Sequence, residues 1–170
     1  GQSDKRQYFG GSIFMMDSSI VIDNSELIIE KSSSTYMGGG MYMLGGSMTL
    51  QNHAKVHITK NNAYSMGGGM MIDTIESQKN VVISIDSQSS FELDENSCTF
   101  GSGMYIVGLS YIGPKLTNGY GRVLPSKIAR NRKIDVNIHN GGILNIHHNS
   151  AKMYLASGLP MGVGLLVQFS

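Results

Sequence analysis

Apolar and polar residues alternate in four short segments of the chain, and each segment ends in Asn or Ser. The segments occupy residues 27–32, 56–61, 91–96 and 144–149 and share the order apolar, any, apolar, any, any, then Asn or Ser. Alternation with a period of two is typical of a β-strand with one buried face. Asn and Ser favour a tight turn, because their side chains hydrogen-bond to nearby backbone groups. The pattern therefore predicts four equivalent strands, each followed by a corner.

Two further elements recur beside these segments. One is a glycine run followed by apolar residues, which begins at Gly10, Gly38 and Gly67 and is matched by Gly101-Ser-Gly. The other is a short apolar stretch, found at residues 20–22, 48–50, 81–85 and 134–138. We expect glycine where the chain takes positive φ or where stacked backbones approach closely, and we expect the Met, Ile and Tyr that follow to fill the interior. A phosphate-binding loop is not favoured, because no Lys-Ser or Lys-Thr follows the glycines.

Three short strands per copy, without a helical pattern between them, predict the fold class. We expect an all-β chain that forms a right-handed parallel β-helix, a solenoid of about four to five coils with three short strands in each. Equivalent residues would then stack about 4.8 Å apart. One apolar column would comprise Leu27, Val56, Phe91 and Leu144, and a second would comprise Ile29, Ile58, Leu93 and Ile146. The residues expected to maintain this architecture, including a polar ladder at one corner, are Gly38, Gly39, Gly67, Gly68, Asn61, Asn96 and Asn149.

The two motifs resemble the repeats of the polymorphic outer-membrane protein family, in which Gly-Gly-small-apolar alternates with apolar-x-x-Asn. The matching positions are Gly10-Gly-Ser-Ile13, Gly38-Gly-Gly-Met41, Gly67-Gly-Gly-Met70, Ile58-x-x-Asn61, Leu93-x-x-Asn96 and Ile146-x-x-Asn149. The resemblance covers most of the chain except residues 107–133. It departs from the family pattern where Ser32 replaces Asn and where Met follows the glycines. It implies a β-helical passenger region with surface display and adhesion, but no catalytic residue, since a fold does not determine a function.

Length and composition are those of one domain. The chain has 170 residues, 41% of them apolar, which suffices for a single core. We interpret residues 1–170 as one β-helix segment, either a fragment of a longer chain or an element of an assembly, because neither end supplies an obvious polar cap. The chain contains no run of about 18 apolar residues, so the sequence predicts no transmembrane helix.

The net charge of +1 hides an uneven distribution. Residues 1–95 contain six Lys or Arg and eleven Asp or Glu, a balance of −5, whereas residues 96–170 contain seven and one, a balance of +6. In a solenoid, sequence position corresponds to height along the axis, so one end would be acidic and the other basic. Three interpretations stay open: an ordinary solvated surface, head-to-tail association with another subunit, and an anionic partner at the basic end.

The best candidate for specific contact is a basic insertion at residues 107–133, since loops on a rigid scaffold commonly carry binding. It combines basic and aromatic residues and contains no acid, which suits an anionic polysaccharide or an acidic protein surface. The candidate binding residues are Lys115, Arg122, Lys127, Arg130, Arg132, Lys133, Tyr111 and Tyr120. The alternative is a solvated loop without a specific role. A nucleic-acid partner is not favoured, because no nucleic-acid-binding motif is present.

The remaining reactive side chains predict no chemistry. Cys98 occupies the same position as Ala63 and Ala151, so we expect a small buried residue rather than a reactive thiol. The outward column that contains His57 has no second histidine and one carboxylate, whereas a metal site needs three or four convergent ligands. We therefore predict no metal, no cofactor and no catalytic residue.

These observations favour a non-enzymatic structural or adhesive rod, extracellular or at the cell surface, that assembles end to end and binds an anionic partner through the basic insertion. The alternative is a polysaccharide lyase or hydrolase of the pectin-lyase-like β-helix class. The acidic residues Asp73, Asp86, Asp94 and Asp135 are scattered among different strands and corners, which disfavours general acid–base catalysis.

Overall fold

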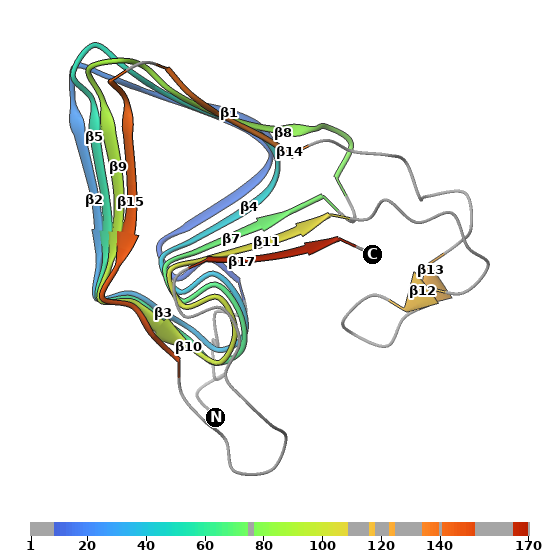
Figure 1. Cartoon of the computed structure of the whole chain (residues 1–170). Coiled ribbons are helices and arrows are strands. Elements are labelled where there is room, and N and C mark those ends of the chain that lie inside the picture. The colour runs from blue at the N-terminus through green and yellow to red at the C-terminus, as the bar shows by residue number, and fades with distance from the viewer. Residues whose placement is uncertain are drawn as a thin grey trace, which may run out of the picture.

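The computed structural model describes residues 9–74, 77–108, 116–117, 123–124, 134–139, 141–151 and 165–169. These residues form strands and turns, and no helix occurs among them (Figure 1). Most strands pair in parallel with the equivalent strand of the preceding or following copy. The all-β prediction is therefore confirmed, and so is the parallel arrangement of the strands.

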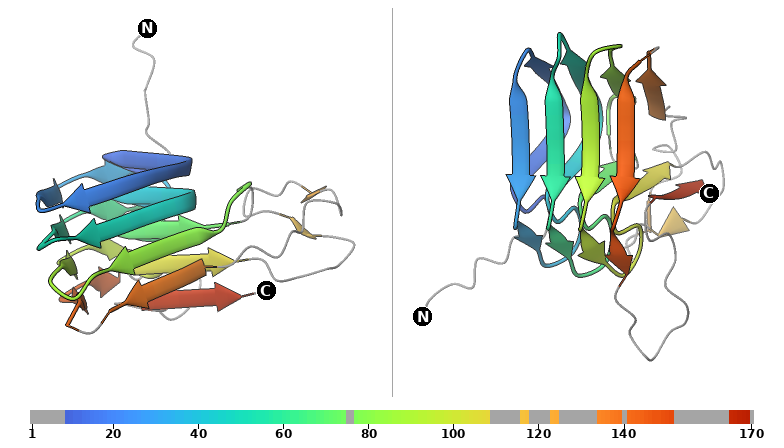
Figure 2. Two further views of the ribbon diagram at one scale, coloured as in Figure 1. Left: turned by 90° about the horizontal axis from the view of Figure 1, so that it is seen from above. Right: turned by 60° about the vertical axis from the view of Figure 1, so that its left-hand side comes forward.

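The Asn-terminated segments form one four-stranded sheet in the order β15-β9-β5-β2. Its strands are β2 (Glu26–Glu30), β5 (Lys55–Thr59), β9 (Ser90–Asp94) and β15 (Ile143–His147), which lie side by side in Figure 2. Leu27 pairs with Val56, Val56 with Phe91, and Leu144 with Phe91, so the first predicted apolar column is confirmed. The second column is confirmed by the pairs Ile29 with Ile58, Ile58 with Leu93, and Ile146 with Leu93.

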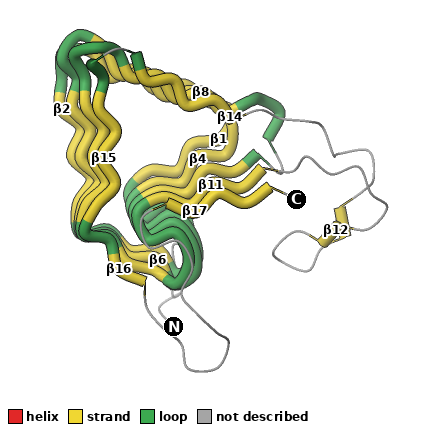
Figure 3. The backbone as a smooth tube through the Cα atoms, viewed as in Figure 1, coloured by secondary structure: helices red, strands yellow, loops and turns green. Residues whose placement is uncertain are grey.

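The glycine elements and the third apolar stretches join into a seven-stranded sheet that bends around the core. Its strands are β1 (Ile13–Asp23), β4 (Met41–Gln51), β7 (Met70–Asp73), β8 (Val81–Ile85), β11 (Met104–Gly108), β14 (Ile134–Ile138) and β17 (Leu165–Phe169). The first half of β4 pairs with β7 and its second half with β8. Figure 3 shows this bend, with the sheet covering two sides of the outline and β2 to β15 the third.

The long strands β1 and β4 differ from the expected separate short strands. In these two copies the glycine element and the next apolar stretch are one strand of 11 residues. Asp17 and Gly45 have φ of 48° and 72° and interrupt the register between Met16↔Leu44 and Ser18↔Gly46. One residue with positive φ in β1, and the two glycines Gly45 and Gly46 in β4, thus turn the strand around a corner while pairing continues on both sides. In later copies the two parts are separate strands.

Two small sheets complete the described structure. Two-residue strands β3 (Ser33–Ser34), β6 (Asn62–Ala63), β10 (Ser97–Cys98) and β16 (Ser150–Ala151) stack in parallel just after the Asn and Ser positions. Within the predicted insertion, β12 (Leu116–Thr117) pairs antiparallel with β13 (Val123–Leu124).

The core consists of two apolar clusters on opposite faces of the glycine strands. The main cluster buries alternate residues of the glycine strands, which are Met41, Met43, Met70 and Ile72. These residues pack with apolar residues of the facing sheet, which include Val56, Ile58 and Phe91. The residues between them on the glycine strands belong to a second cluster, which includes Tyr42, Met71 and Tyr105. The expectation that the Met, Ile and Tyr after the glycines fill the interior is confirmed for the residues of the main cluster, whereas the alternate residues lie in the second cluster because strand alternation sends them to the other face.

The glycine runs are needed for two different reasons, as expected. Gly38 has φ of 64°, a left-handed conformation that side chains rarely adopt. At Gly39 a Cβ atom would overlap with the Gly68 carbonyl oxygen and with the backbone of Asn62, so stacked backbones leave no space for it. Gly67 and Gly68 repeat the same two roles one copy later.

Candidate functional site

The outward face of the four-stranded sheet collects the histidines and carboxylates. Side chains alternate along each strand, so Glu92 and Asp94 of β9 point away from the core that buries Phe91 and Leu93. Glu92 pairs with His57 on β5, and Asp94 pairs with His147 on β15. Parallel in-register pairing therefore brings groups far apart in sequence onto one surface.

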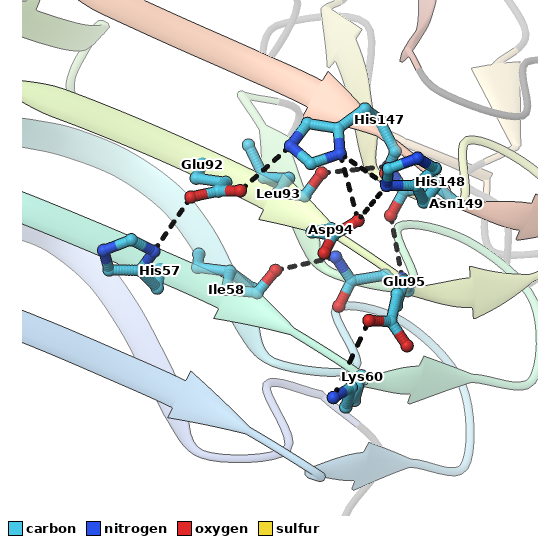
Figure 4. A network of polar contacts seen from close by, with 11 residues as sticks. His57, Ile58, Lys60, Glu92, Leu93, Asp94, Glu95, His147, His148 and Asn149 are labelled. Atoms are coloured by element: carbon cyan, nitrogen blue, oxygen red, sulfur yellow. Dashed lines mark hydrogen bonds and ion pairs between the residues drawn. The ribbon is translucent and has the colours of Figure 1, made fainter.

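A continuous polar network links these side chains (Figure 4). His57 Nδ1 lies 3.0 Å from Glu92 Oε2, and His147 Nε2 lies 2.9 Å from Glu92 Oε1. Glu92 thus bridges histidines on both neighbouring strands. His57 Nε2 extends the network to Glu26 Oε1 at 3.4 Å.

Three potential ligand atoms converge at the end of this network. Asp94 Oδ1 lies 3.1 Å from His147 Nδ1 and 3.1 Å from His148 Nδ1, and the two Nδ1 atoms are 2.8 Å apart. We call Asp94, His147 and His148 the His–Asp triad. Among the described residues it is a group of His, Cys, Asp or Glu that could hold a metal ion.

The triad is open to solvent on one side. The exposed fractions of the side chains are 20% for Asp94, 38% for His147 and 76% for His148. His148 has φ of 47°, in the same corner position as Lys31, Lys60 and Glu95, which also have positive φ. This left-handed corner turns the His148 ring back toward His147. The two rings lie edge to face, with their centroids 4.7 Å apart.

The sequence interpretation missed this grouping. The outward column of His57 contains neither Asp94 nor His147, and the triad instead combines the neighbouring outward column with the corner residue that follows it. The signal that could have found it is the pair Glu92 and Asp94, two residues apart on one strand, beside His147 at the end of the next strand and His148 directly after it. The expectation of no metal site rested on a lack of convergent ligands, and these three ligand atoms do converge.

The predicted structural asparagines form a ladder at the corner before the two-residue strands. Asn61 Oδ1 accepts from the Ser32 N–H, and Asn61 Nδ2 donates to the Ile29 carbonyl, both at 2.9 Å. Asn96 and Asn149 also each bind the preceding copy, through a backbone N–H and a strand carbonyl. All three asparagines are buried, so the expected polar ladder is confirmed.

Carboxylates hold the equivalent corners that precede β2, β5 and β9. Asp86 accepts from the N–H of Asn52 at 2.6 Å and of Gln88 at 3.0 Å, and a hydrogen bond from Ser89 Oγ is the main cause that lowers its pKa. Asp23 accepts from the side chains of Asn52 and Gln51 at 2.8 and 2.9 Å, and these bonds lower its pKa as well.

Cys98 is fully buried and its thiol contacts the Phe100 carbonyl oxygen at 2.9 Å. Burial raises the pKa of the Cys98 thiol, which keeps it protonated and poorly nucleophilic. The expectation of a small buried residue at this position is confirmed.

The candidate binding residues of the basic insertion lie outside the described residues. These are Lys115, Arg122, Lys127, Arg130, Arg132, Lys133, Tyr111 and Tyr120. Their role as a contact surface stays a prediction.

No protein-family model, no curated protein and no solved structure matches this chain. The resemblance to the polymorphic outer-membrane repeats is therefore untested. In the part of the chain that the structure describes, no helix has the length and apolar character needed to cross a bilayer.

Proposed function

We propose that the chain is a structural and adhesive rod, a right-handed parallel β-helix that acts outside the cell or at its surface without catalysing a reaction. The observation that supports this most directly is the register. Equivalent residues of successive copies pair without a shift in each of the three parallel sheets, from Ile13↔Met41 to Ser97↔Ser150. A chain that devotes its recurrent glycine, asparagine and apolar positions to stacking is suited to building length.

The two ends of the described stack are suited to association with further copies. At one end, β1, β2 and β3 each pair on one side only within the described structure. At the other end, Val136 and Ile138 continue the columns of the buried Ile83 and Ile85, yet they are 37% and 47% exposed. A second copy that adds its β1–β3 end to this end would extend the sheets and cover these side chains. The opposite charge of the two halves, −5 and +6, would favour this orientation.

The basic insertion is the proposed contact for an anionic partner such as an acidic polysaccharide. The insertion contains six basic side chains and no acidic side chain that could neutralise them. Charge attraction of this kind is strong at low salt and is screened over about 8 Å at physiological ionic strength.

Charge reversal tests the proposed contact. We expect Arg130→Glu with Arg132→Glu to weaken binding to chondroitin sulfate or polygalacturonate at least about fivefold at low salt, while the thermal unfolding midpoint stays unchanged. The matched control is Lys31→Glu with Lys55→Glu, which reverses two exposed charges outside the insertion and should weaken binding much less. Affinity that is equal in all three proteins would refute a role for the insertion. Affinity can be measured by calorimetry or biolayer interferometry.

A polysaccharide lyase or hydrolase is the second candidate, because Glu92, Asp94 and three histidines lie together on one outward strand face (Figure 4). Carboxylates and imidazoles in contact are suited to proton transfer. Incubation with pectin, alginate and chondroitin, followed by assay of unsaturated and reducing ends, separates the two functions. A rod produces neither kind of end, whereas an enzyme produces one of them and loses that activity in Glu92→Gln.

A further inference from the structure

We propose that the His–Asp triad, Asp94, His147 and His148, binds a divalent transition-metal ion of the first row, with Zn²⁺ as a representative. The site requires the pairing of β9 with β15 and the corner after β15. It does not depend on end-to-end assembly or on the basic insertion, so it goes beyond the function proposed above.

The spacing of the three ligand atoms matches a metal coordination sphere. The Nδ1 atoms of the two histidines and Asp94 Oδ1 form a triangle with sides of 2.8, 3.1 and 3.1 Å. Metal bonds of about 2.1 Å that meet at about 90°, as in an octahedral site, place neighbouring ligand atoms about 3.0 Å apart, whereas the tetrahedral geometry usual for Zn²⁺ places them about 3.4 Å apart. An ion above the centre of this triangle would therefore reach all three atoms at octahedral angles, and tetrahedral Zn²⁺ would need them to move apart by about 0.3–0.6 Å.

Hydrogen bonds alone cannot satisfy the triangle. Each imidazole Nδ1 carries at most one proton, and an ionised carboxylate carries none. With no proton or one proton among the three atoms, at least one contact brings two lone pairs together. With a proton on both nitrogens, two N–H groups face each other across 2.8 Å. A cation removes this conflict, because it attracts the lone pairs of all three atoms at once.

Glu92 supplies the outer group that metal-binding histidines commonly have. Its Oε1 lies 2.9 Å from His147 Nε2, and this contact favours a proton on Nε2 and a free lone pair on Nδ1. Its other oxygen is held by His57 Nδ1 at 3.0 Å. Glu92 thus orients the His147 ring toward the proposed ion, and His57 in turn orients Glu92.

The chemical class of the ion follows from the ligands. Imidazole nitrogen suits Zn²⁺, Cu²⁺, Ni²⁺ and Fe²⁺, whereas Mg²⁺ and Ca²⁺ prefer oxygen ligands. Three protein ligands leave one or more coordination positions of the ion free. Because His148 is exposed, these free positions would be accessible to solvent. Such an open site can accept water or a donor group from a bound partner.

Titration of the untagged, chelator-treated protein with Zn²⁺ by calorimetry tests the proposal. We expect saturable binding of one ion and no comparable binding of Mg²⁺. His147→Gln and Asp94→Asn should each weaken Zn²⁺ binding by more than about tenfold, and Glu92→Gln, a change outside the ligand set, by about tenfold. His139→Gln is the matched control, since it removes an exposed histidine on another side of the stack and should leave affinity unchanged.

A second readout keeps the test independent of folding defects. Co²⁺ bound by nitrogen and oxygen ligands should produce visible absorption bands in the wild type, and these bands should be lost in His147→Gln and kept in His139→Gln. Circular dichroism of the variants establishes whether the strands persist. Absence of saturable Zn²⁺ binding by the wild type, or an equal loss in His139→Gln, would overturn the proposal.

Discussion

At the scale of single residues, the buried asparagines connect successive copies through hydrogen bonds to the backbone. Asn61 is fully buried, and its amide satisfies the Ser32 N–H and the Ile29 carbonyl of the preceding copy. Its own N–H is satisfied by Asn96 Oδ1 at 2.9 Å. Each asparagine thus closes the backbone of one corner and connects two copies.

Removal of one such side chain should be costly. Asn61→Ala leaves the Ser32 N–H and the Ile29 carbonyl without their partner, and we expect it to lower the free energy of unfolding by about 2–4 kcal/mol. Asn145→Ala is the control, because Asn145 lies on the exposed face of β15 and its loss should cost less than about 0.5 kcal/mol. Chemical denaturation measures both values. Equal values for the two variants would contradict the proposed role of the ladder.

At the scale of elements, the sequence predicted the strands and their register but not every connection between them. Alternation and the recurrent Asn indicated which residues stack, because a shift of one residue would turn each apolar side chain outward. The continuous strands β1 and β4 were not predicted, since one or two residues with positive φ, Asp17 in β1 and Gly45 with Gly46 in β4, leave little trace in a hydropathy pattern. The His–Asp triad was not predicted either, because it combines one position of one copy, Asp94, with two adjacent positions of the next, His147 and His148.

The corner carboxylates make the connections between elements sensitive to acid. The pKa values of Asp17, Asp23 and Asp86 all lie below the ordinary value of 3.8. For Asp17 partial burial opposes this shift, but hydrogen bonds from Ser77 Oγ and from the N–H groups of Gln78 and Lys79 outweigh it. A lowered folded-state pKa means that these carboxylates stabilise the fold above the unfolded-state value. Their contribution is lost as the pH falls through the folded-state value.

We therefore expect the free energy of unfolding to decline as the pH is lowered from about 5 to about 2.5. Asp86→Asn keeps an acceptor oxygen for the Asn52 N–H but cannot be protonated in this range, so its decline should be shallower than that of the wild type. Urea denaturation at a series of pH values measures the difference. Parallel pH profiles for the two proteins would show that the Asp86 carboxylate does not contribute.

At the scale of the whole molecule, the free edge of β2 is where the proposed end-to-end contact can be tested. The Lys55 N–H donates to the Ser25 carbonyl at 2.9 Å, and the Lys31 N–H donates to the Thr59 carbonyl at 3.3 Å. Because a parallel strand bonds to one neighbour through alternate residues, the odd-numbered residues of β2 face β5. Glu26, Ile28 and Glu30 therefore direct their backbone groups to the unpaired edge, where the next copy would bind (Figure 2).

Proline at this edge should block assembly without weakening the subunit. Ile28→Pro removes an N–H that faces outward, and proline is tolerated on edge strands when its nitrogen faces away from the sheet. Ile28→Ala is the control, since it also removes the exposed side chain but keeps the N–H group. In sedimentation velocity over a range of concentrations, the wild type and Ile28→Ala should associate, and added salt should weaken this association because the ends carry opposite charge. Ile28→Pro should stay monomeric with a nearly unchanged unfolding midpoint.

A contact of this kind joins unlike surfaces and does not close on itself, so its product is a filament of variable length rather than a dimer. A wild type that is monomeric at every concentration, or a closed dimer, would exclude the stacking of one copy on the next.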